Sequence, residues 1–472
     1  MIIKIKNFVF KNKPIFIMSF IFTIALLIIN YKNLGSMDLA MLCGSTFLLL
    51  IALGLIYHNE KISLLLFILS LPVLVTARKF CYVDFGIFKI TFEAIYITIF
   101  FLFKFKKILL TLKKDYYKKE NKIVYLVISF GVVAFSSVIF SPDVEESIRL
   151  TFLSVAVPIM FFLICLTVIN RDDIKKIYYI LILNLNFSCI YGMFQVFKGG
   201  VSLDSLNRNR ALLTFGYHNV NIFAAILITI TPLLLELILY KKTTVKEKVF
   251  LYSSLIIQIT GLLITFTRGA WLTFILSVFI ILISKKYKKY LFVLCGLGLV
   301  VMKPVLEFII SRGTGSVTFL KNPSAVSRIQ AIFTDVIIMK KYPFGTGMGN
   351  FQELYKEFAV QGYMSIPTVL RWKMIVAPYM LEHPHNLFLQ IGVDLGVLTM
   401  LLFLSILIIT ILKTIKYYDN NRGFLVSIVT FSFMAVMTGS ELNHKGVISG
   451  TLILFLIIAL VEINNRVQEN IE

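Results

Sequence analysis

Charge is scarce in this 472-residue sequence, of which only 15% is Asp, Glu, Lys or Arg. Soluble domains carry roughly 25% charged residues, whereas here 58% of the residues are apolar and the mean hydropathy is +0.87. This composition excludes a soluble enzyme, a nucleic-acid-binding domain and a disordered chain. The net charge of +22 instead indicates membrane orientation, because basic residues accumulate in the cytoplasmic loops of membrane proteins.

Metal-binding and disulfide patterns are also missing. The five cysteines contain no Cys-x-x-Cys pair, so neither a disulfide framework nor a zinc site is expected. Magnesium sites use carboxylate oxygens, and no cluster of Asp and Glu occurs in the predicted external loops, so no magnesium site is expected. We therefore predict that no metal and no cofactor takes part, and no nucleic acid is expected as a partner.

Long apolar runs that are bounded by charged residues dominate the sequence. A transmembrane helix needs about 20 predominantly apolar residues, and we predict an all-α polytopic membrane protein with about 12–14 transmembrane helices. The fourth run contains Lys89 and Glu93, whose spacing of four residues suggests a neutralising pair on a helix. The runs lie near 15–31, 37–57, 62–77, 85–103, 123–141, 148–169, 177–197, 221–240, 249–265, 269–284, 291–310, 387–412, 424–440 and 447–463.

The distribution of Lys and Arg orients these spans. The predicted spans place both chain ends on the same side of the membrane. The segments on that side hold roughly three times as many Lys and Arg residues as the short loops on the opposite side, which predicts cytoplasmic N- and C-termini. We expect N-terminal transmembrane helices over 1–200 and transmembrane helices with Arg-bearing outward loops over 201–310. An extracytoplasmic loop follows over 311–385, and C-terminal transmembrane helices over 386–472. Loops as long as 311–385 are usually functional.

Short amphipathic helices are expected within this external loop. Ala325–Lys341 predicts one, with Ser324 as its N-cap. Its predicted apolar face carries Ile329, Ile332, Phe333, Val336 and Ile337. The glycine-rich stretch 345–349 after Pro343 is interpreted as a tight turn, since no strand precedes it as a nucleotide-binding motif requires. Asn350 is expected to cap the next short helix.

Three clusters on the predicted outer side carry polar chemistry: Thr267-Arg268-Gly269, Arg208-Asn-Arg210 with His218, Asn219 and Asn221, and His383-Pro-His385-Asn386. Arg268 stands at the mouth of a helical hairpin, where a guanidinium facing lipid costs several kcal/mol. It could snorkel to lipid head groups or clamp an anion, because a guanidinium fits phosphate oxygens in a bidentate way. The same two alternatives hold for Arg208, Arg210 and Arg328.

His385 is the candidate proton acceptor. Nearby positive charge disfavours the imidazolium, so its ring should stay neutral and able to accept a proton near pH 7. The amide of Asn386 could orient that ring. His383, two residues earlier, competes for the same role, and the residues alone leave this choice open.

These residues resemble a known family. His385-Asn386, nine further residues, Gly396, two residues and Thr399 resemble the His-[Asn/Ser/Gln]-x9-Gly-x-x-[Gly/Thr/Tyr] signature of bacterial O-antigen ligases and related polysaccharide polymerases. The resemblance selects His385 over His383. Thr267-Arg-Gly-Ala-Trp-Leu272 is similar to the family's Ser-Arg-Gly-Ala-Trp turn, which gives Arg268 a role at the substrate phosphate.

Two further stretches are similar to the family. Arg210 to Asn221 with Phe223-Ala224 resembles its Arg-containing outward stretch, with Leu213 where a glycine is common and no proline before Asn221. Ser327-Arg328 and 343–349 fit its long-loop pattern. The resemblance covers roughly residues 200 to 415.

The resemblance implies a metal-independent glycosyltransferase of the bacterial cytoplasmic membrane with its active site outside. It would move a polyprenyl-pyrophosphate-linked glycan to a hydroxyl of a lipid, glycan or protein acceptor. His385 would act as general base, while Arg268 and Arg210 stabilise the leaving pyrophosphate. Arg328, Asn386, Arg208 and Asn221 are the expected substrate-binding residues.

Two alternatives remain open. A polymerase of the same family would hand the glycan to another lipid-linked repeat unit, as in capsule synthesis. A flippase for lipid-linked oligosaccharides also has many helices, but transporters usually show repeated halves and broken helices near the midplane. No such repeat is visible in this sequence, and the polar residues concentrate in one external loop.

Overall fold

The computed structural model describes residues 12–30, 35–77, 82–84, 89–117, 122–213, 219–284, 286–296, 319–377, 380–438 and 449–466. The first half contains α2 (Lys13–Asn30), α3 (Ser36–His58), α4 (Glu60–Ala77), β1 (Tyr82–Asp84), β2 (Lys89–Thr91), α5 (Phe92–Tyr117), α6 (Lys122–Ser136), η1 (Ser137–Phe140), α7 (Val144–Thr151), η2 (Phe152–Ala156), α8 (Val157–Val168), η3 (Arg171–Asp173), α9 (Ile174–Lys198), α10 (Leu203–Asn209) and η4 (Arg210–Leu212). The second half contains α11 (Val220–Tyr240), α12 (Val245–Ile264), α13 (Arg268–Ile281), η5 (Phe319–Lys321), α15 (Pro323–Lys341), α16 (Phe351–Ser365), α17 (Thr368–Arg371), α18 (Leu387–Leu395), α19 (Val397–Lys416), α20 (Tyr418–Thr438) and α21 (Ser449–Asn465).

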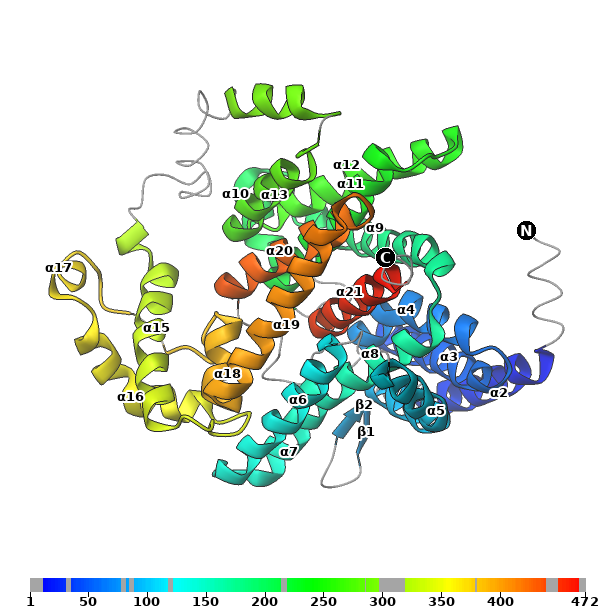
Figure 1. The fold of residues 1–472 in the computed structure, drawn as a ribbon, viewed down its shortest axis with the longest axis horizontal. Helices are drawn as coiled ribbons and strands as arrows, with labels where there is room; N and C mark the ends of the chain where they lie inside the picture. Colours follow the sequence, from blue (N-terminus) through cyan, green and yellow to red (C-terminus); the bar gives the residue numbers. More distant parts are fainter. Residues whose placement is uncertain are drawn as a thin grey trace.

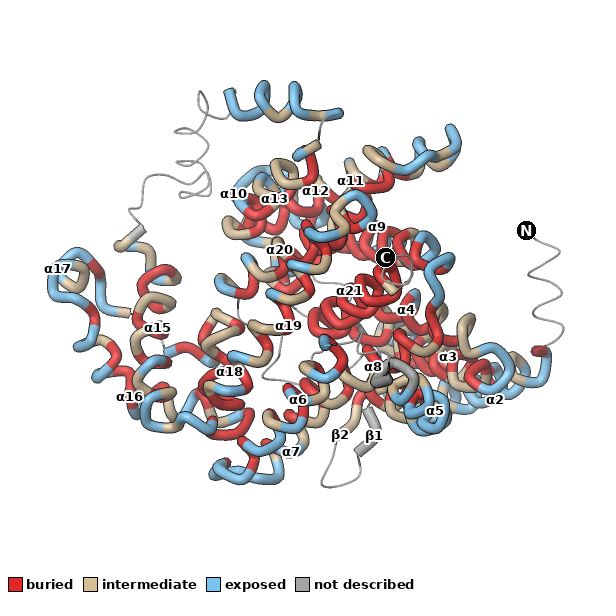
Figure 2. Tube along the Cα trace, viewed as in Figure 1, coloured by how far each residue is buried: buried red, intermediate tan, exposed pale blue. Residues whose placement is uncertain are grey.

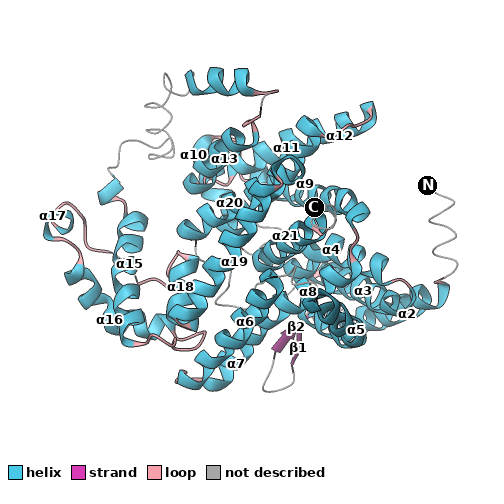
Figure 3. Cartoon of the chain, viewed as in Figure 1, coloured by secondary structure: helices cyan, strands magenta, loops and turns pink. Residues whose placement is uncertain are grey.

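The all-α fold is confirmed. Helices make up almost all of the described chain, and a short antiparallel hairpin of β1 and β2 is the exception (Figure 3). Lys89 pairs with Asp84 in the hairpin register, so it lies on a strand, and Glu93 is in the first turn of α5. The expected Lys89–Glu93 pair on a single helix is therefore wrong, because the helix begins only at Phe92.

Within the described residues, seven helical segments are long and apolar enough to cross a membrane: Asp38–His58, Lys122–Phe140, Val144–Val168, Arg171–Lys198, Val220–Tyr240, Val245–Ile264 and Val397–Lys416. Three shorter apolar helices are Lys13–Ile29, Arg268–Ile281 and Ser449–Asn465. Helices suit such runs because every backbone polar group finds its partner within the segment. The polytopic architecture is thus confirmed, while the number of spans and their orientation stay predictions. Most of the run 291–310 lies outside the described residues.

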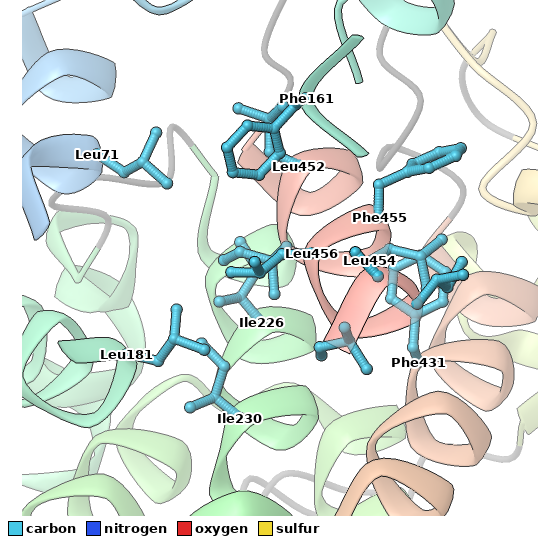
Figure 4. Packing of buried hydrophobic residues seen from close by; sticks show 14 of the residues in the cluster. Leu71, Phe161, Leu181, Ile226, Ile230, Phe431, Leu452, Leu454, Phe455 and Leu456 are labelled. Atoms are coloured by element: carbon cyan, nitrogen blue, oxygen red, sulfur yellow. The ribbon is translucent and has the colours of Figure 1, made fainter. Parts of the chain in front are cut away.

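α21 is the central helix of the core. All of its residues are buried, and Phe455 lies 6.2 Å, centroid to centroid, from Phe162 on α8. Figure 4 shows Leu452, Leu454 and Leu456 of α21 among buried side chains of neighbouring helices. Because α21 is buried all round, other helices and not lipid surround it. In contrast, α2 exposes most of its apolar side chains, as expected of a helix that faces lipid (Figure 2).

The long connection after α13 folds into helices of its own. α15 packs against α16 and also contacts α18. Figure 1 shows α15, α16 and α17 on the side of the molecule away from α2 and α3. Ala331, Ile338, Phe351, Tyr355 and Phe358 form a separate hydrophobic cluster there with Val393 of α18. These helices therefore dock through their own small core onto α18.

The apolar run 387–412 does not form one span, contrary to expectation. The chain breaks at Gly396, whose φ is +94°, and the membrane-length helix begins at Val397. The short helix α18 instead packs against α15, α19 and α20. A positive φ is accessible to glycine at no steric cost, which explains why an uninterrupted apolar run can still contain a helix break.

Candidate active site

Arg268 begins α13 immediately after a tight turn that follows α12. The turn contains Phe266, a residue with φ of +49°, and it is held by side-chain bonds to the last turn of α12. Thr265 Oγ1 donates to the carbonyl oxygen of Leu262 at 2.7 Å, and Trp271 Nε1 donates to the same oxygen at 3.0 Å. These bonds satisfy carbonyl groups that a helix end otherwise leaves without partners. The half-buried Arg268 is thereby held on a rigid hairpin.

Arg210 is brought to this turn from a distant part of the chain. Its Nη1 donates to the carbonyl oxygens of Thr265 at 3.1 Å and Phe266 at 3.2 Å. A cation is favoured here because the C-terminal end of α12 carries partial negative charge. Burial, and then the charge of Arg268, lower the pKa of Arg210. The structure thus places two guanidinium groups beside one turn.

Asn221 joins the same turn through Thr267. Thr267 Oγ1 donates to Asn221 Oδ1 at 3.3 Å. Asn219 caps α11, with its Oδ1 accepting from the backbone nitrogen of Asn221 at 2.7 Å. The start of α11 is therefore fixed against the α12–α13 turn. His218 lies outside the described residues.

Arg208 differs from Arg210. It lies in the last turn of α10 and is exposed. Arg210, two residues later, is half-buried against the turn. The two arginines are therefore close in sequence but differ in their surroundings. Of the two, only Arg210 lies at the Arg268 turn.

The two histidines of the His383-Pro-His385-Asn386 cluster lie together. The ring centroids of His383 and His385 are 4.1 Å apart. His385 has φ of +55°, a conformation uncommon for residues other than glycine. Such strain persists only where the surroundings hold it, and it occurs often at functional sites.

Asn386 fixes the position of the helix that follows His385. Its Oδ1 accepts from the backbone nitrogens of Phe388 at 3.0 Å and Leu389 at 3.2 Å, which makes it the N-cap of α18. Gly396 ends the same helix, and Thr399 Oγ1 bonds back to the Leu395 carbonyl oxygen at 2.7 Å. The spacing of the sequence signature therefore corresponds to one short helix with a residue specialised for each end.

The glycine-rich turn after α15 is confirmed as a close backbone approach. Gly345, Gly347 and Gly349 all have positive φ. The backbone nitrogen of Thr346 donates to the Val393 carbonyl oxygen at 3.1 Å, so the turn is bonded to the last part of α18. Asn350 stands at the N-cap position of α16 without capping it; its Nδ2 donates instead to Ser141 Oγ at 3.0 Å and Thr346 O at 2.9 Å.

Two details expected of helix α15 differ in the structure. The N-cap is Asn322, whose side chain accepts from the Ala325 nitrogen, not Ser324. The expected apolar face is buried only in part: Ile332 is 43% exposed and Val336 37% exposed. The other three residues, Ile329, Phe333 and Ile337, are partly buried against hydrophobic clusters. The buried face carries small and polar residues, namely Ala325, Val326, Ser327, Gln330, Ala331, Thr334, Asp335 and Ile338. Arg328 is half-buried on the same helix.

Two buried carboxyl groups lie where α15 meets α18, and sequence reasoning missed them. Asp335 is 0% exposed and Asp394 is 3% exposed. Burial raises the pKa of Asp394 to about 7. Burial, and then the nearness of Asp394, raise the pKa of Asp335 well above its usual range. The available signal was the single acidic residue within the apolar run 387–412.

The structure thus assembles two groups of predicted site residues. One contains Arg210, Arg268 and Asn221, and the other contains His385 and Asn386. Arg328 lies on α15, a helix that contacts α18. Arg268 lies on α13, and His385 directly precedes α18. Both helices pack against α20. A shared pocket for His385 and Arg268 stays a prediction.

Fold and site together define a multi-pass α-helical membrane protein with paired arginines at a helical turn and a capped helix after a histidine pair. A family model described as O-antigen ligase matches residues 253–404. The resemblance seen in the sequence is confirmed for this segment, which makes up about a third of the chain. The matched range includes Arg268, Arg328, His385 and Asn386. No curated protein matches the chain.

Proposed function

We propose that this protein is a glycosyltransferase that moves a polyprenyl-pyrophosphate-linked glycan to an acceptor hydroxyl at the outer face of a bacterial cytoplasmic membrane. The O-antigen ligase match supports the class of reaction. The observation that carries the assignment is the bonding of Arg210 to the turn that presents Arg268. Arg210 lies outside the range that the family model matches, whereas the turn to which it bonds lies inside that range. The contact therefore supports the proposal by adding a second cation beside Arg268.

The paired arginines are suited to the leaving group. As the glycosidic bond breaks, negative charge develops on the pyrophosphate, and preorganised guanidinium groups stabilise that charge. The two bonds of Arg210 to the turn use only Nη1. A guanidinium has five N–H donors, and Nε and Nη2 form no hydrogen bond with the described residues, so we assign them to phosphate oxygens. Arg328, Asn221 and the exposed Arg208 would bind more distant parts of the donor.

His385 would remove the proton from the acceptor hydroxyl. The neutral imidazole accepts this proton while the oxygen attacks the anomeric carbon, and the bond to pyrophosphate breaks on the opposite side. This direct displacement inverts the configuration at that carbon. The reaction requires no metal, because the arginines take the charge of the leaving group.

Transfer in vitro tests this proposal. Purified protein would receive a defined polyprenyl-pyrophosphate glycan and separate acceptors, with chelator present. We expect His385→Ala to abolish transfer, while His58→Ala, an exposed histidine at the end of α3, keeps it. Arg268→Lys should lose much of its activity because the bidentate geometry is gone. Full transfer by the His385→Ala variant would remove this residue from the mechanism.

The acceptor distinguishes a ligase from a polymerase. The two activities differ only in what receives the glycan, and the residues above serve either. Deleting the gene separates them: loss of a ligase should leave long lipid-linked polymer, whereas loss of a polymerase should leave single lipid-linked repeats.

A further inference from the structure

A cavity of about 350 Å³ lies among the ends of four helices, α9, α11, α20 and α21. Its lining includes four cationic side chains, Arg171, Lys175, Lys241 and Lys242, and one carboxylate, Glu236. The volume lies within the range of small-molecule sites. None of these residues belongs to the proposed transferase site.

Glu236 is already neutralised within the cavity lining. It is 1% exposed, and Lys241 Nζ lies 3.0 Å from its Oε1. Its Oε2 accepts from Tyr178 Oη at 3.2 Å and from the backbone nitrogen of Gly423 at 3.1 Å. A buried carboxylate with three donors organises the floor of the cavity.

Two of the three remaining cations carry a positive charge that no described carboxylate pairs with. Lys175 is shared with Glu247 at 3.0 Å. Arg171 and Lys242 form no ion pair with any acidic residue that the structure describes. Both are exposed at the rim, where a guanidinium and an ammonium can reach the same anion.

The cavity and the Arg268 turn lie at opposite ends of α20. Asn420 and Phe424 line the cavity near the start of this helix. Gly269, next to Arg268, packs against Met434 and Met437 near its end. At 1.5 Å per residue, the 13 residues between Phe424 and Met437 span about 20 Å. The cavity ends of α9 and α11 also belong to candidate membrane spans, on the side that the Lys and Arg distribution predicts to be cytoplasmic.

We propose that this cavity binds the phosphodiester head group of an anionic membrane lipid, with Arg171 and Lys242 as its principal ligands. Basic pockets between transmembrane helices on the cytoplasmic side are suited to such head groups. The apolar Ile174, Leu237 and Phe424 in the lining favour a lipid over a free ion, because they can contact its glycerol and acyl carbons. The proposal does not depend on the transferase activity.

Thermal unfolding of the full chain in neutral detergent tests this site. Phosphatidylglycerol should raise the Tm of the wild-type protein, since a ligand that binds only the folded state stabilises it, and phosphatidylcholine should not. In the variant Arg171→Gln/Lys242→Gln this rise should fall to about one third or less. The control Lys246→Gln/Lys248→Gln removes the same charge from exposed positions in the first turn of α12 and should respond like the wild type.

Two results would overturn the proposal. One is an equal phosphatidylglycerol response in the Arg171→Gln/Lys242→Gln variant and the wild type. The other is a full response to inorganic phosphate that depends on Arg171 and Lys242, with no further rise from the lipid, because the ligand would then be a soluble anion. If the double variant does not fold, Lys242→Gln alone gives the same comparison with a smaller loss.

Discussion

Gly345 and Gly396 meet backbone to backbone. A Cβ atom added to Gly345 would lie 2.6 Å from the backbone nitrogen of Gly396, and both residues have positive φ. The contact joins the glycine-rich turn after α15 to the residue that ends α18. Because His385 stands just before the other end of α18, this contact helps to fix the orientation of the proposed general base.

We expect Gly396→Ala to lower both stability and transfer. A methyl group at this φ costs about 1–2 kcal/mol, and it would meet the Phe344 carbonyl carbon at 2.7 Å. Thermal unfolding and the transfer assay measure the two effects. The control is Gly44→Ala in α3, where nothing lies within 4 Å of the added atom. Equal stability of the two variants would contradict the structural importance of this contact.

The buried carboxyl groups predict a pH-dependent stability. An unfolded Asp has a pKa near 3.9, whereas burial raises the pKa of Asp394 to about 7. The folded state therefore holds a proton that the unfolded state has released, and this contribution to stability is lost as pH rises from about 4 through about 7. The pKa of Asp335 is also raised, which acts in the same direction.

Thermal unfolding at pH 5 and pH 8 measures this effect, with about 1.4 kcal/mol expected per pKa unit. We expect the wild-type Tm to be lower at pH 8, and Asp394→Asn to reduce the difference. Glu353→Gln, at an exposed position of α16, should keep the wild-type difference. An unchanged pH dependence in the Asp394→Asn variant would show that this carboxyl group is not the source.

The elements that follow from local pattern could be predicted from the sequence. The apolar runs predicted most of the helices. The His-Asn signature identified the residues at the two ends of α18. The break at Gly396 could not be predicted by hydropathy, because the apolar run continues on both sides of it. At this break the backbone of Gly396 lies close to the backbone of Phe344, which is distant in sequence.

The buried face of α15 could not be predicted for a related reason. A Cβ atom added to Gly362 of α16 would lie 2.0 Å from Thr334 Oγ1, so the two helices approach too closely for large side chains between them. Small residues therefore occupy the interface, and Ile332 and Val336 point outward. The joining of Arg210 to the α12–α13 turn is likewise a long-range contact that no local pattern encodes.

Substitutions of Asn386 distinguish a cap from a substrate ligand. Asn, Asp and Ser are comparable N-caps, whereas Ala loses about 0.5–2 kcal/mol. If capping is the main role, Asn386→Ser and Asn386→Asp should keep most transfer activity and stability, and Asn386→Ala should lower both. Loss of transfer in all three variants at unchanged Tm would instead indicate that the amide contacts substrate.

Arg210 and Arg208 form a natural matched pair for testing the anion clamp. Lysine at position 210 keeps one charge but cannot reproduce the guanidinium geometry that bonds two turn carbonyls and still presents further donors. We expect Arg210→Lys to lower the rate of transfer by about 10²-fold, comparable to removing one preorganised donor from an oxyanion site. Arg208→Lys keeps the charge of an exposed side chain that we assign to a part of the donor away from the pyrophosphate, so its rate should stay within a few-fold of wild type. Equal rates for the two variants, measured with the same lipid-linked donor at saturating acceptor, would show that the bonding of Arg210 to Thr265 and Phe266 only stabilises the turn.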